Sequence, residues 1–156
     1  MLVQSDDDAA EWYHKPGVSL HEYTIHRRIY NILHELQKTE TVPVMVPKVR
    51  SYDRERQCLT MSRIDGDNLS DIYGENFDDV PANLTRAVRE AIRLLYSYRI
   101  VYPDVTGYNF VLSRSGHLYI VDFEHASCFP ADRAEIDWYV QEFVEGEYAD
   151  WNPDFR

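Results

Sequence analysis

The chain has 156 residues, of which 44% are hydrophobic and 28% charged, a composition typical of one ordinary globular domain. Its net charge of −11 repels phosphate backbones and anionic lipids, so we expect neither direct nucleic-acid binding nor membrane association. No stretch approaches the length of an apolar membrane span. Two widely separated cysteines, Cys58 and Cys128, favour a reducing compartment, either cytoplasmic or nuclear.

Helical periodicity is clear in two long segments. Apolar residues recur on one face of residues 20–36, with Ser19 placed as an N-cap, and again on one face of residues 81–99. A short helix is predicted over residues 68–73, and a last helical pattern over residues 134–144. The acidic residues at the N terminus predict no regular element.

Short β-prone runs lie between these helices, bounded by proline, glycine and aspartate. The predicted strands are residues 44–46, 57–64, 100–102, 110–112 and 118–123. The Ser115-Gly116 turn separates the last two runs, which predicts a hairpin directly after the second long helix.

One pair of segments carries a chemical pattern. Asp104 is followed five positions later by Asn109, and the Asp122-Phe123 pair begins thirteen positions after Asn109, across the predicted hairpin. These intervals resemble the catalytic core of the protein kinases. Turn capping by Asp and Asn is the alternative interpretation, but it does not require such matched intervals.

The resemblance implies a role for each of these side chains. Asp104 would accept a hydrogen bond from the attacking hydroxyl, while Asn109 and Asp122 would hold the Mg²⁺ that accompanies ATP. Mg²⁺ prefers oxygen ligands, which a carboxylate and an amide on one loop and one hairpin would supply. The ion keeps its other coordination positions for water and phosphates.

The resemblance extends toward the N terminus. Residues 59–66 are similar to the kinase strand and hinge that contact adenine, with Met61 as gatekeeper and Ser62 and Ile64 beside it. Glu22 is similar to the helix glutamate that pairs with an ATP-contacting lysine, for which Lys15 is the candidate. The alternative interpretation of both residues is a charge on a solvated face.

Within the superfamily, the chain is similar to compact atypical kinases such as the kinase-like ATPases of the KEOPS complex. Thr106 carries part of this likeness and is a candidate nucleotide contact, while Asp137 would be a structural anchor. The implied fold is α+β and protein kinase-like, with a reduced N-lobe and a truncated helical C-lobe. We expect a frayed N terminus over residues 1–14 and one domain over 15–156, divided into N-lobe (15–64) and C-lobe (65–156) parts.

Several departures from the kinase pattern leave alternatives open. No glycine-rich loop is present, Tyr102-Pro103 stands in place of His-Arg, and Glu124 replaces the glycine of Asp-Phe-Gly. A partner protein that completes the N-lobe is therefore one expectation. The spacing of His21, His26 and His34 does not match a zinc site, and His125 lies close enough to Asp122 to approach a phosphate.

The function predicted from these motifs is an ATP- and Mg²⁺-dependent phosphotransferase that acts on a protein hydroxyl of the Ser/Thr type. One alternative is a pseudokinase, a nucleotide-binding interaction module without catalysis. A second is a small-molecule kinase that resembles the aminoglycoside phosphotransferases, whose His-x-Asp is not matched by Tyr102-Pro103-Asp104.

Overall fold

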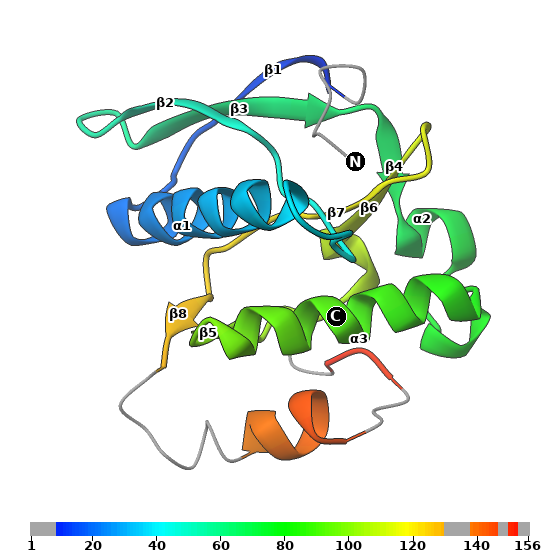
Figure 1. Ribbon diagram of the computed structural model, residues 1–156. Helices are drawn as coiled ribbons and strands as arrows, with labels where there is room; N and C mark the ends of the chain where they lie inside the picture. The colour runs from blue at the N-terminus through cyan, green and yellow to red at the C-terminus, as the bar shows by residue number, and fades with distance from the viewer. Residues whose placement is uncertain (1–8, 130–137, 147–149, 153–156) are drawn as a thin grey trace.

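The computed structural model describes residues 9–129, 138–146 and 150–152. A three-stranded sheet lies over helix α1, a β-hairpin occupies the middle of the molecule, and helix α3 lies beneath the hairpin (Figure 1). No helix in the described part of the chain is long and apolar enough to cross a membrane.

The upper sheet has the antiparallel order β1-β3-β2, formed by β1 (Ala9–Lys15), β2 (Val49–Asp53) and β3 (Cys58–Ile64). The sequence predicted β3 but neither neighbour, and it predicted a frayed chain as far as residue 14. That prediction is wrong for residues 9–14. The patterning of β1 was uninformative because Trp12 and Tyr13 are exposed, with arginine side chains over their rings. Lys15 is the last residue of β1.

Helix α1 (Leu20–Gln37) confirms the first helical prediction. The Ser19 hydroxyl accepts a hydrogen bond from the Glu22 backbone nitrogen, and Glu22 lies in the first turn, where the helix dipole favours negative charge. The buried stripe of Ile25, Ile29 and Leu33 turns the helix toward the core.

The hairpin is formed by β6 (Phe110–Ser113) and β7 (Leu118–Ile120), and β4 (Gly66–Asn68) pairs with the outer edge of β6. The predicted strand at residues 44–46 is reduced to one parallel bridge between Met45 and Tyr119. The prolines on both sides of this run, Pro43 and Pro47, have no backbone N–H to extend a ladder.

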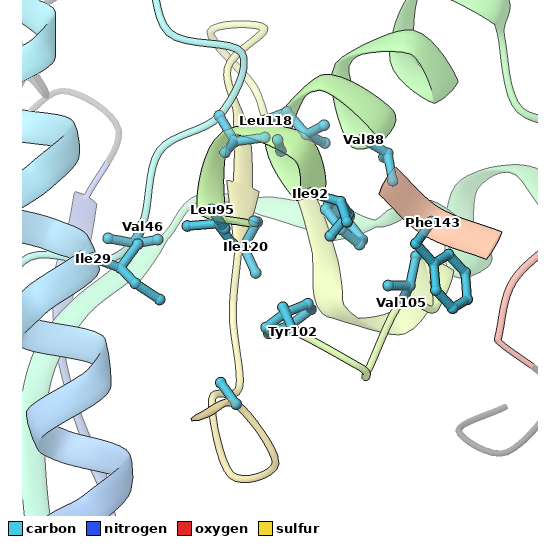
Figure 2. Close-up of a cluster of buried hydrophobic side chains, with 14 of the residues drawn as sticks. Ile29, Val46, Val88, Ile92, Leu95, Tyr102, Val105, Leu118, Ile120 and Phe143 are labelled. Atoms are coloured by element: carbon cyan, nitrogen blue, oxygen red, sulfur yellow. The ribbon is translucent and has the colours of Figure 1, made fainter. Parts of the chain in front are cut away.

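The lower part contains α2 (Leu69–Tyr73), the 3₁₀ turn η2 (Phe77–Asp79) and α3 (Ala82–Ser97), which confirms the predicted short and second long helices. After α3, β5 (Ile100–Val101) pairs with β8 (Ser127–Cys128). The main hydrophobic core lies between α3, the hairpin and α1 (Figure 2). It includes Val88, Ile92 and Leu95 of α3, Leu118 and Ile120 of β7, and Ile29 of α1.

The predicted helix at residues 134–144 lies partly outside the described residues, as does Asp137. Its described part is helical at Trp138 and Tyr139 and continues as the π-helix η4 (Val140–Val144). Tyr139 and Phe143 are buried against the core.

Candidate phosphotransfer site

The loop after β5 brings Asp104 and Asn109 together. The Asn109 side-chain amide donates to the Asp104 carbonyl at 3.0 Å, which leaves the amide oxygen as the ligand atom. Thr106 is buried, and its hydroxyl caps the 3₁₀ turn η3 (Gly107–Asn109) by accepting from the Tyr108 nitrogen. In this structure Thr106 therefore shapes the loop that presents Asn109.

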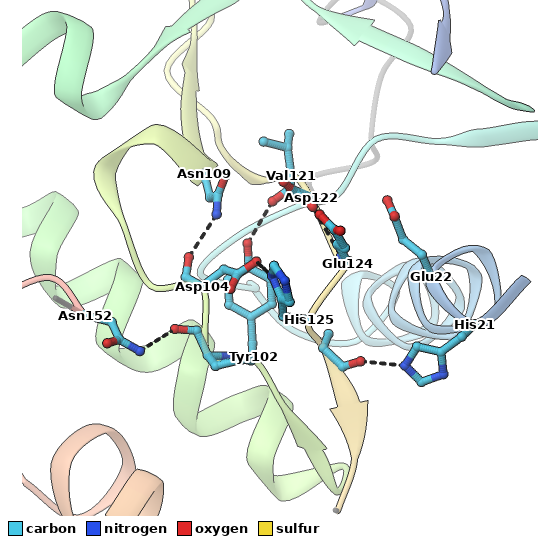
Figure 3. A network of polar contacts seen from close by, with 12 residues as sticks. His21, Glu22, Tyr102, Asp104, Asn109, Val121, Asp122, Glu124, His125 and Asn152 are labelled. Atoms are coloured by element: carbon cyan, nitrogen blue, oxygen red, sulfur yellow. Dashed lines mark hydrogen bonds and ion pairs between the residues drawn. The ribbon is translucent and has the colours of Figure 1, made fainter. Parts of the chain in front are cut away.

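Asp122 comes directly after the hairpin, next to residues 102–109, called the catalytic loop after the kinase element that they resemble. The Val121 nitrogen donates to the Asn109 carbonyl at 2.9 Å, and Figure 3 shows Asp122 near Asn109 and Asp104. Asp122 has a φ of +66°, a left-handed conformation that aspartate tolerates better than most residues, and its carboxylate accepts from the Glu124 nitrogen. This turn fixes the carboxylate at the end of the hairpin.

Lys15 lies between two acidic side chains. Its Nζ is 2.9 Å from Glu22 Oε2 and 3.8 Å from Asp122 Oδ1. Burial desolvates the ammonium group and acts to lower its pKa, but the hydrogen bond to Glu22 and the charge of Asp122 outweigh this and raise the pKa of Lys15. The pair predicted from sequence is thus formed, and it extends to the proposed metal ligand.

A cleft of about 310 Å³ opens between the upper sheet and the hairpin, within the usual range of about 300–1,000 Å³ for small-molecule sites. Its lining includes Met61, Ser62, Ile64, Val121, Lys15 and Asp122. The hinge residues predicted from sequence therefore share one cleft with the lysine and with one metal-ligand candidate.

Asp104 is 3% exposed, and its carboxylate oxygens differ in their contacts. Oδ2 accepts a hydrogen bond from His125 Nδ1 at 2.8 Å, whereas Oδ1 is buried and has no hydrogen-bond partner among the described residues. Burial raises the pKa of Asp104 despite the histidine, and the hydrogen bond to Asp104 raises the pKa of His125. The sequence suggested a phosphate contact for His125, and nothing in its spacing indicated Asp104 as its partner.

Two further residues hold the catalytic loop and were also missed. The buried Tyr102 donates from its hydroxyl to the Val121 carbonyl at 2.7 Å, joining the loop to the segment that carries Asp122. Asn152 brackets Asp104, because its side chain donates to the Pro103 carbonyl and its backbone nitrogen to the Val105 carbonyl, each at 2.8 Å. Residues this distant in sequence give no local signal.

The family model for the RIO domain matches residues 4–135 of the chain. The chain belongs to the RIO family. This atypical, protein kinase-like family confirms the superfamily and the fold class predicted from the catalytic motif. The nearer likeness to the KEOPS kinase-like ATPases and the roles of individual RIO-domain residues stay predictions.

Other comparisons add little to the RIO assignment. The crystal structure of the Rad53 kinase domain and SCD2 matches with a TM-score of 0.47 and 17% identity, over 74% of this chain and 44% of that chain. The RIO chain described here thus spans less than half of that solved chain. The search of curated proteins gave no match to the RIO chain.

Proposed function

We propose that the protein is an ATP- and Mg²⁺-dependent phosphotransferase whose acceptor is a protein hydroxyl of the Ser/Thr type. The observation that carries the proposal is the convergence of Lys15 and Asp122 on one cleft beside the loop of Asp104 and Asn109. Met61, Ser62 and Ile64 line the same cleft, where the adenine would lie.

The donor set suits magnesium bound together with phosphates. Among the described residues, no group of three or more His, Cys, Asp or Glu side chains could hold a metal ion. Mg²⁺ in nucleotide sites needs only one or two protein oxygen ligands besides phosphates and water, and the Asp122 carboxylate and the Asn109 amide oxygen supply them. The ion would neutralise charge on the transferring phosphoryl group.

The remaining side chains position the reactants. Lys15 would bind the nucleotide phosphates and is held in place by Glu22. Asp104 would receive the hydrogen bond of the acceptor hydroxyl at Oδ1, the buried oxygen to which no described residue donates. Burial raises the pKa of Asp104, which makes its carboxylate a better proton acceptor than an exposed aspartate.

The test is transfer of the γ-phosphoryl group from labelled ATP, with Mg²⁺ or with EDTA, to the protein itself and to a panel of protein and aminoglycoside acceptors. Asp122→Asn should abolish transfer. Asp53→Asn, at the exposed end of β2, is the control and should leave transfer unchanged. Wild-type transfer no greater than that of Asp122→Asn would refute catalysis, and transfer to an aminoglycoside alone would refute the protein acceptor.

A pseudokinase is the second candidate, favoured by the position of Glu124. Its exposed carboxylate contributes to the raised pKa of Lys15, so its negative charge acts where the triphosphate would lie. Thermal-shift titration with Mg-ATP distinguishes the two candidates. Saturation at a hundredfold excess over the dissociation constant stabilises a folded protein by about 2.7 kcal/mol, and such a shift without turnover would support the pseudokinase.

A further inference from the structure

Asp104 and His125 form a pair of residues that the kinase pattern does not contain. The imidazole Nδ1 lies 2.8 Å from Asp104 Oδ2, and the two residues come from separate segments, the catalytic loop and the turn after Asp122. The Asp104 side chain is almost completely buried, whereas that of His125 is half exposed. The histidine thus approaches the carboxylate from the solvent side.

The contact decides which carboxylate oxygen is left for another ligand. Oδ2 is occupied by the histidine, and within the part of the chain that the structure describes Oδ1 is buried without a partner. A buried carboxylate oxygen without a hydrogen bond costs free energy, and such a cost is tolerated where a ligand supplies the missing donor. The backbone of Asp104 is held separately, because its carbonyl oxygen accepts a hydrogen bond from the Asn109 side chain.

The turn that carries His125 is itself attached to α1. His21, in the first turn of α1, donates from Nε2 to the Ala126 carbonyl at 2.8 Å, and Figure 3 shows this contact beside the His125 contact. The Ala126 nitrogen donates to the Phe123 carbonyl, which closes the turn. His125 therefore stands on a closed turn that α1 holds at Ala126.

We propose that His125 is a positioning residue for phosphotransfer, which holds Asp104 by Oδ2 so that Oδ1 receives the acceptor hydroxyl. This inference rests on the proposed function. Through His125, the turn that carries Asp122 also sets the orientation of the carboxylate that receives the acceptor's proton. The turn would thereby fix the Asp122 carboxylate, which would hold the metal ion, relative to the Asp104 carboxylate, which would receive the acceptor.

The test compares His125→Ala with His125→Asn, whose side-chain amide places a donor near the position of Nδ1. Losing the alignment of a general base should lower kcat of His125→Ala by about 10- to 100-fold. The KM for ATP should stay within about twofold, since His125 contacts Asp104 and not the nucleotide cleft. His125→Asn should recover most of the lost kcat, and His34→Ala, an exposed histidine in the last turn of α1, should behave as wild type.

Several results would overturn the inference. They are an unchanged kcat in His125→Ala, a change in KM alone, which would indicate a phosphate contact, or equal losses in the Ala and Asn variants. Nitrogen-15 NMR of the imidazole should also show the Nδ1 resonance of His125 shifting in Asp104→Asn, whether or not the protein turns over. Absence of Mg²⁺-dependent turnover in the wild type would show that the proposed function is wrong, and the positioning role of His125 in phosphotransfer would then be wrong as well.

Discussion

Gly107 of the catalytic loop lies against Ser70 of helix α2. An ideal Cβ on Gly107 would overlap the Ser70 hydroxyl oxygen and lie 3.1 Å from the Ser70 backbone nitrogen. Gly107 is buried between Asp104 and Asn109, so a shift here would move the loop that carries both side chains. We expect Gly107→Ala to displace this loop from the helix.

The magnitude follows from the nature of the clash. Overpacking a buried site costs about 1–3 kcal/mol, which for a domain of this size lowers Tm by about 2–4 °C per kcal/mol. Ser70 Oγ is buried and has no hydrogen-bond partner in the described ranges 9–129, 138–146 and 150–152, so Ser70→Ala should be nearly neutral or slightly stabilising. In the double variant the nearest contacts of the new Cβ are 3.1 Å and 3.3 Å, which are tight but not overlapping.

The assay is a double-mutant cycle by calorimetry and urea unfolding. Gly107→Ala should lose about 2 kcal/mol and the double variant clearly less, with a coupling of about 0.5–3 kcal/mol between contacting residues. Turnover should fall in Gly107→Ala and recover in part in the double variant. Additive free energies would show that the loop does not rest on Ser70 and would refute this account of the glycine.

Three further predictions concern the groups around the cleft. Glu22→Gln should raise the KM for ATP about tenfold by loosening Lys15, whereas Glu35→Gln, in the exposed last turn of α1, should not. His26, which donates to the Pro47 carbonyl, is buried and has a pKa lowered to about 4 by desolvation. In the unfolded chain His26 has its ordinary pKa of 6.5, so the unfolded state takes up a proton at a higher pH than the folded state does. The free energy of unfolding should therefore fall by about 3 kcal/mol as pH drops from 6.5 to 4. His26→Gln should flatten that dependence in urea unfolding measured at a series of pH values. Asn152→Ala should lose about 0.5–1.5 kcal/mol in calorimetry, because it removes one of the two donors to the Pro103 carbonyl, which still accepts from the Val105 nitrogen. An unchanged Tm would contradict this.

The parts of the site that could be predicted are those encoded over short distances in sequence. Asp104, Asn109 and Asp122 could be expected to lie together because one loop and one hairpin fix their intervals, and Glu22 could be placed because it lies on a helix with a clear N-cap. Their roles stay predictions. Strand β1 was missed because its exposed aromatic residues follow no alternation between buried and exposed positions. The contact of His125 with Asp104 and the part played by Asn152 were missed because the partners are distant in sequence.

Tyr102 shows why a substitution within a motif is poorly judged from sequence alone. In the sequence, Tyr102-Pro103 in place of His-Arg is a departure from the kinase pattern that leaves the working of the site open. In the structure the Tyr102 ring packs edge-on against Phe123 with centroids 5.7 Å apart, and its hydroxyl reaches the Val121 carbonyl. The tyrosine therefore ties the catalytic loop to both neighbours of Asp122 with one buried side chain. Such contacts fix the placement of Asp104 relative to Asp122, so the tyrosine does not by itself argue against an active site. Glu124, whose negative charge acts on Lys15, is the departure that we expect to impair activity more.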